Sequence, residues 1–104
     1  MVTTVIEGHD YQVIVFEKGK TGYASPVIKF QNGPVKEVGV NGIQNIDLID
    51  ILIDRMIYLQ TFENGKYASF DNDCMLTRLR EFRTLDLART SARKKRDVEG
   101  TSKV

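Results

Sequence analysis

The stretch from Asn45 to Phe62, "NIDLIDILIDRMIYLQTF", carries the strongest structural pattern of the chain. Polar side chains recur in it every three or four residues, with apolar side chains between them: Asp47, Asp50, Asp54, Tyr58 and Thr61. This spacing predicts an α-helix. Asn45 is suited to cap its start, and Asp47 suits the positive first turn. Because more than half of the circumference is apolar, we expect other elements to cover this helix on two sides.

A second helix is predicted beyond the connection "ENGKYASF". Gly65 is expected to break the first helix, and Ser69 or Asp71 to cap the second, which should run from about Asn72 to Arg96. Its inward side is predicted to carry Met75, Leu76, Leu79, Phe82 and Leu85. At 1.5 Å per residue this helix is about 38 Å long, as long as a domain of this size is wide or longer. The hairpin should therefore project and be covered by a copy of itself, most simply in a symmetric dimer.

The residues before this hairpin have the pattern of β-strands instead. "TTVIE" and "YQVIVFE" are rich in β-branched and aromatic residues, and "GHD" between them suits a hairpin turn. "PVIKFQNGPVKEVGV" is expected to form a second hairpin that turns at Asn32-Gly33. The predicted fold class is α+β and oligomeric: an antiparallel sheet over residues 1–41 and a long antiparallel helical hairpin over 42–97. With a tail over 98–104, these parts are expected to form a single domain, 1–104.

Composition limits the classes of protein that the chain can represent. Its 104 residues, 41% of them apolar, suit one globular domain. No run approaches the roughly 18–20 apolar residues of a membrane helix, and no signal peptide is recognisable, so we expect a cytosolic protein without a membrane partner. Cys74 is the single cysteine, expected to be a buried spectator thiol, and His9 is the single histidine. We therefore expect no disulfide, no metal site and no cofactor.

Positive charge is segregated toward the end of the chain, where the sequence reads "RTSARKKRDVEGTSKV". Nine bases stand against four acids from Arg78 onward, while residues 1–77 carry six bases and ten acids. Arg89, Arg93 and Arg96 fall at i, i+4 and i+7 on one helix face, and guanidinium groups donate paired hydrogen bonds to phosphate oxygens. This face predicts an anionic partner. The alternative is a solvated basic turn favoured by the helix dipole.

Three carboxylates of the first helix share one face: Asp47, Asp50 and Asp54. Carboxylates so spaced are able to bind a divalent cation or to act as an acid/base pair. No histidine, further carboxylate cluster or glycine-rich ligand loop accompanies them. We therefore favour a solvated stripe or a set of partners for the arginines of the second helix.

Phe62 and Asn72 flank the connection between the two helices. An aromatic face stacks on a nucleobase, and an amide hydrogen-bonds to its edge. Within one hairpin Asn72 lies about 25 Å from Arg89, but an antiparallel second copy would bring the loop of one subunit toward the basic end of the other. Core packing of Phe62 and N-capping by Asn72 are the alternatives.

Four segments together resemble a known family. "FQNGPVKEVGVNGIQN", the helix "IDLIDILIDRMIYLQTF", the opening "FDN" and the terminal "RT…RDVEGT" are similar to the first family of phage Thoeris anti-defence proteins, whose helical hairpin is shared with a phage anti-CBASS sponge. The similarity covers roughly Phe30 to Thr101. It implies a non-enzymatic sponge that acts in the infected bacterial host. Such a sponge sequesters the cyclic ADP-ribose isomers made by a TIR-domain defence protein. The resemblance also implies assembly as a dimer or, as in some family members, a hexamer.

The resemblance also assigns site residues. The family's pocket aromatic matches Phe62, its asparagine Asn72, and its arginines Arg89 and Arg93; Arg96 joins them on the same helix face. It further implies a separate site for cyclic di- or trinucleotides, with Val98, Glu99, Gly100 and Thr101 as candidates. Two departures stand out. The second helix carries more arginine than the family pattern, and Asp97 stands where glycine is common.

Two other functions remain open from the sequence. A small basic nucleic-acid-binding regulator would use the C-terminal helix and would bind DNA with steep salt dependence. A degrading enzyme would show turnover, but the chain offers no convincing nucleophile–base pair, metal site or carboxylate dyad. We therefore expect a small-molecule ligand and a second copy as partners, no nucleic acid, and no catalytic residues.

Overall fold

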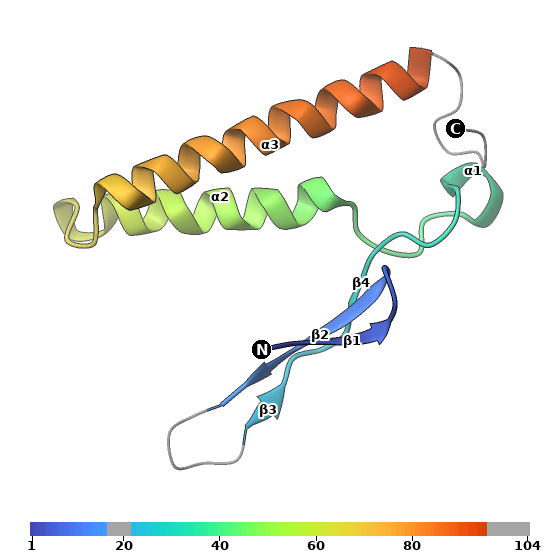
Figure 1. The fold of residues 1–104 in the computed structure, drawn as a ribbon, viewed down its shortest axis with the longest axis horizontal. Coiled ribbons are helices and arrows are strands. Elements are labelled where there is room, and N and C mark those ends of the chain that lie inside the picture. Colours follow the sequence, from blue (N-terminus) through green and yellow to red (C-terminus); the bar gives the residue numbers. More distant parts are fainter. Residues whose placement is uncertain (17–21, 96–104) are drawn as a thin grey trace. The chain divides into compact units, whose positions relative to one another are not determined.

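The computed structural model describes residues 1–16 and 22–95, which belong to two compact units (Figure 1). The sheet unit, residues 1–43, contains β1 (Val2–Ile6), β2 (Asp10–Val15), β3 (Tyr23–Ala24), β4 (Ile28–Lys29) and the short helix α1 (Val35–Val38). The helical unit begins at Gln44 and contains α2 (Asn45–Thr61), the 3₁₀ turn η1 (Phe62–Asn64) and α3 (Phe70–Lys95). The predicted α+β fold class is confirmed, whereas the single-domain organisation stays a prediction.

The sheet is arranged around β2. β1 pairs with it antiparallel through the turn at residues 7–9, where the N–H of His9 donates to the carbonyl of Ile6 at 3.0 Å. β3 and β4 also pair antiparallel with β2: β3 pairs with the end of β2, at Ile14 and Val15, and β4 with its beginning, at Asp10 and Tyr11. Pro26, which lacks an N–H, interrupts the strand between them, and the hydroxyl of Ser25 accepts a hydrogen bond from the N–H of Val13. The first predicted hairpin is therefore confirmed.

The second predicted hairpin, over residues 26–40, is wrong. Chain 34–40 contains no strand; one helical turn, α1, follows Pro34 instead. Pro34 has φ −65°, and its carbonyl accepts the N–H groups of Glu37 and Val38, which begins a helical turn. Gly33 and Gly39, both at positive φ, bound the turn. The Asn32-Gly33 dipeptide indicates a hairpin turn. No strand follows it in chain 34–40, because Pro34 lacks the N–H that a strand ladder requires.

Side-chain amides close the loop that surrounds α1. The Nε2 atom of Gln31 donates to the carbonyls of Gly33 and Gly39, and its Oε1 atom accepts the N–H of Asn41. Asn41 exchanges two further hydrogen bonds with the backbone of Asn32. These bonds satisfy backbone groups that a strand ladder would otherwise pair.

Helix α2 begins with a reciprocal cap. Gln44, not the predicted Asn45, is the N-cap residue: its backbone carbonyl accepts the N–H of Asp47 at 3.1 Å, and the Asp47 carboxylate accepts the Gln44 N–H at 2.8 Å. Asn45 is instead the first residue of the helix. The start of the helix near residue 45 is confirmed.

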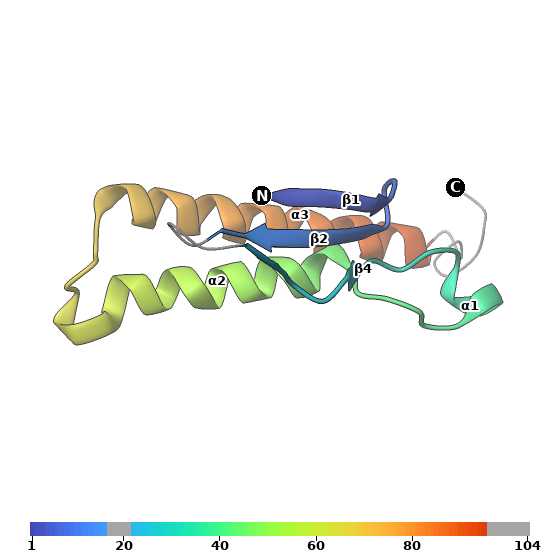
Figure 2. The same ribbon diagram turned by 90° about the horizontal axis from the view of Figure 1, so that it is seen from below.

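Helix α3 runs antiparallel to α2, and the two views show the helices side by side (Figures 1 and 2). Ser69 caps its start, as predicted, because the Ser69 hydroxyl accepts the N–H of Asn72 at 3.0 Å. The connection turns at Gly65, whose φ of 86° is left-handed. The predicted helical hairpin is thus confirmed through Lys95, and Arg96 lies outside the described residues.

The hairpin buries little apolar surface in a single chain. Leu76 is the buried apolar side chain of the described residues, at 6% exposure, and Leu79 is half-buried. Met75, Phe82 and Leu85, predicted to face inward, are instead 48%, 45% and 70% exposed. Each helix of the pair covers only one side of the other. The apolar side chains of α3 occupy a wider part of its circumference, so some of them lie outside the contact with α2.

Candidate functional site

Three aromatic rings gather where α2 meets the connection. Phe62, half-buried at the end of α2, lies 5.1 Å from Tyr58 and 5.7 Å from Tyr67 between ring centroids. The Tyr67 ring is nearly parallel to Phe62, at 5°, and Tyr58 is tilted by 35°. The predicted aromatic Phe62 therefore belongs to a cluster whose two tyrosines the sequence analysis missed. The sequence offered one indication of this cluster: Tyr58 lies four residues before Phe62, and Tyr67 lies five residues after it.

Asn72, the predicted amide, is held beside this cluster. Its Nδ2 atom donates to the carbonyl of Tyr67 at 3.0 Å, and its backbone N–H donates to Ser69. Within residues 1–16 and 22–95, no protein donor contacts its Oδ1 atom. The side chain therefore does not cap the helix, because its amide N–H donates to the Tyr67 carbonyl in the loop and Ser69 is the capping residue. The structure brings Phe62 and Asn72 together at one end of the hairpin.

The predicted arginines lie at the other end of α3. Arg89 is exposed and Arg93 is half-buried, and both precede Lys95, the last residue of the helix. They lie about 25 Å or more along the helix from Asn72. One chain therefore does not join the aromatic and basic parts of the predicted site. The second-site candidates Val98, Glu99, Gly100 and Thr101 lie outside the described residues.

An exposed stripe on α3 connects the two ends. Met75, Phe82 and Arg89 are spaced by seven residues, which keeps them on one helix face within about 20° per step. Leu85 flanks this face and is 70% exposed. The stripe, here Met75, Phe82, Leu85 and Arg89, is apolar near the loop and basic near the C-terminal end of the helix. An apolar stripe of this kind is expected to bind another protein surface.

The three aspartates of α2 have separate roles. Asp47 forms the N-terminal cap, Asp54 is exposed, and Asp50 accepts a hydrogen bond from Nε of Arg83 on α3 at 2.7 Å. The predicted pairing with an arginine of the second helix is therefore confirmed for Asp50. No group of three or more metal-ligating side chains occurs among the described residues.

The Asp50–Arg83 pair should stabilise the hairpin modestly. Its side chains are 50% and 41% exposed, so solvent screens their attraction. We expect a coupling free energy of about 0.5–1 kcal/mol in a double-mutant cycle of Asp50→Asn and Arg83→Gln, measured by urea unfolding. A coupling energy of zero within error would mean that the contact adds nothing to the stability of the hairpin.

Other features of the hairpin differ from expectation or lie apart from the site. Cys74 is exposed, so the prediction of a buried thiol is wrong; it lies on α3 two residues before the buried Leu76, on a different face. A shallow open groove on α3 is lined by Thr77, Arg80, Glu81, Thr84 and Leu85. Because one helix alone lines it, the groove encloses no ligand. Among the described residues, no helix is long and apolar enough to cross a membrane.

Comparison with known proteins identifies the family. No protein-family model matches the chain. Over 74 residues, 71% of its length, the chain is 42% identical to the protein named Thoeris anti-defense 1 of Bacillus phage SBSphiJ7. The chain belongs to the Thoeris anti-defence family. The matched residues span about half the length of this relative, 50%.

Proposed function

We propose that the protein is a phage anti-defence sponge, which binds a cyclic ADP-ribose signal of a TIR-domain protein and withholds it without cleaving it. Family membership supports an anti-Thoeris role. The observation that carries the ligand proposal is that the two ends of the helical hairpin differ: Phe62 and Asn72 lie together at the loop end, and Arg89 and Arg93 lie near the C-terminal end of α3. Together these groups complement a nucleotide with one base and two phosphates.

The exposed stripe on α3 supports an antiparallel dimer that brings the two groups together. In such a dimer, a two-fold axis near Phe82 places residue 72 of one subunit opposite residue 92 of the other, since each is ten residues from position 82. Asn72 and Phe62 of one subunit then approach Arg89 and Arg93 of its partner. The same association covers apolar side chains that a single chain leaves exposed.

The chemistry of this composite site is binding rather than reaction. Guanidinium groups pair with the two phosphates, and the aromatic ring stacks on the adenine. Dimer burial of these contacts would slow release, which suits a protein that competes with an effector for a scarce messenger in the cytoplasm of the infected host. Larger assemblies, up to a hexamer, and additional binding of cyclic di- or trinucleotides belong to the same proposal.

Calorimetric titration tests this proposal against the nucleic-acid alternative. Purified protein titrated with a cyclic ADP-ribose isomer should show saturable binding with one ligand per protomer. Titration with duplex DNA should show none at physiological salt. DNA binding that weakens steeply as salt is raised, without binding of the small ligand, would favour a nucleic-acid-binding regulator.

A further inference from the structure

Tyr67 contacts both of the residues expected to bind the base. Its ring lies nearly parallel to Phe62, with centroids 5.7 Å apart, and its backbone carbonyl accepts the amide N–H of Asn72 at 3.0 Å. Phe62 has a second ring neighbour, Tyr58, at 5.1 Å. Phe62 is therefore enclosed by two rings, and half of the Tyr67 surface, 50%, remains exposed to solvent.

The connection that carries Tyr67 is held by its own hydrogen bonds. The side chain of Gln60 both donates to the carbonyl of Ser69 and accepts its N–H, at 3.1 and 2.9 Å. The carbonyl of Phe62 accepts the N–H groups of Gly65 and Lys66, and the carbonyl of Gly65 accepts that of Ala68. A loop fixed in this way holds its aromatic side chain before any ligand arrives, which lowers the entropic cost of binding.

We propose that Tyr67 is a base-binding residue of this site, which presents its exposed ring face to a purine and orients Asn72 through its carbonyl. Phe62 then acts as the inner ring of a stack that Tyr67 extends outward. This inference rests on the proposed function, because it names the residue that receives the base of the sequestered nucleotide. Tyr67, rather than Phe62, is then the residue that contacts the purine most extensively, because two rings already enclose Phe62.

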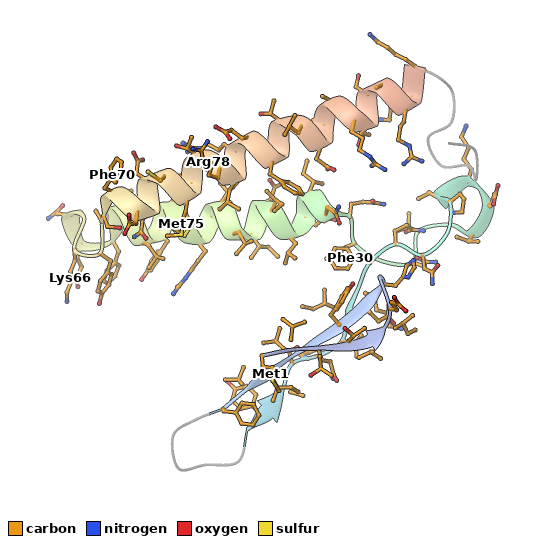
Figure 3. The ribbon with its side chains drawn as sticks, in the orientation of Figure 1. Met1, Phe30, Lys66, Phe70, Met75 and Arg78 are labelled. Carbon is orange, nitrogen blue, oxygen red and sulfur yellow. The ribbon has the colours of Figure 1, made fainter. Side chains whose placement is uncertain are left out.

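Lys66 is the side chain that a base would displace from Tyr67. Its Nζ atom lies 5.6 Å from the Tyr67 ring centroid and 3.5 Å from the Glu63 carboxylate. Both distances are near the outer limits of their kinds of contact, and the two charged side chains are more than half exposed. Lys66 at the tip of the hairpin is seen in Figure 3.

Three variants of Tyr67 test the inference by equilibrium binding of a cyclic ADP-ribose isomer. Tyr67→Leu should weaken binding roughly 5- to 150-fold, the range expected when one base loses its aromatic partner. Tyr67→Phe, which keeps the ring and the carbonyl, should bind like the wild-type protein. Because the chain contains no tryptophan, Tyr67→Trp supplies a single reporter whose fluorescence should be quenched saturably by the ligand. Tyr23→Trp in the sheet unit is the matched control and should not respond.

The outcomes separate this inference from the proposed function. Suppose that the wild-type protein binds the ligand, that Tyr67→Leu binds it with the same affinity, and that the fluorescence of Tyr67→Trp does not change. These results would overturn the role of Tyr67 but not the proposed function. Loss of binding in both Tyr67→Leu and Tyr67→Phe would also overturn it, because stacking alone would not explain the loss. If the wild-type protein itself binds no cyclic ADP-ribose isomer, the proposed function and this inference fail together.

Discussion

Phe82→Asp is expected to prevent formation of the proposed dimer and to abolish retention of the proposed ligand. Phe82 lies at the middle of the exposed stripe on α3 and is 45% exposed in a single chain. At a two-fold axis the substitution places two carboxylates against each other in an apolar interface, where charge is costly to desolvate. Sedimentation velocity should show the loss of the dimer, and circular dichroism should show that the helices remain.

A matched control uses the same substitution two residues further along the helix. Thr84→Asp places the new charge on the opposite face of α3, because two residues turn a helix by about 200°. This variant should remain dimeric and bind normally. A dimeric Phe82→Asp, or a monomeric Thr84→Asp, would show that the stripe is not the interface.

Arg89→Ala should weaken binding of the cyclic ADP-ribose isomer by about 2–4 kcal/mol, or roughly 30- to 800-fold, without unfolding the protein. The side chain is exposed in the single chain, so its removal leaves the hairpin contacts unchanged. In the proposed complex it pairs with a phosphate that the dimer shields from water, and removing it leaves that charge without a partner. Calorimetry measures the affinity, and thermal unfolding checks the fold.

Arg80→Ala is the control for the loss of one positive charge. Arg80 belongs to the same helix but is nine residues, or about two and a half turns, from Arg89, and so lies on the opposite face. The affinity of Arg80→Ala for the ligand should be within about twofold of the wild-type affinity, because an exposed charge outside the site contributes little to binding. Equal losses in both variants would mean that net positive charge, rather than a specific phosphate contact, attracts the ligand.

The helical hairpin could be predicted because its signals are local. The apolar period from Asn45 to Phe62, the break at Gly65 and the cap at Ser69 all act within a few residues. The chain 34–40 could not be predicted so well, because Asn32-Gly33 is typical of a hairpin turn, whereas Pro34 and the amides of Gln31 and Asn41 favour a closed helical loop. Those amide contacts join residues about ten positions apart, beyond the reach of pattern analysis.

The candidate site was predicted only in its separate parts. Side-chain chemistry pointed to Phe62, Asn72 and Arg89, and the length of the second helix showed that one chain keeps them apart. The role of Tyr67 required the structure, because both its parallel ring and its carbonyl contact depend on how the loop folds. The exposure of Met75 and Phe82 likewise followed from the packing of two helices, which leaves an apolar stripe for a partner to cover.

The most direct test of sequestration is to identify what the protein retains. Purified protein is mixed with the product of an activated TIR enzyme, filtered free of unbound ligand and heat-denatured, and the released small molecules are identified by mass spectrometry. We predict release of an intact cyclic ADP-ribose species, one per protomer. Consumption of the signal would show an enzyme instead, and a signal that persists unretained in the filtrate would contradict the sponge.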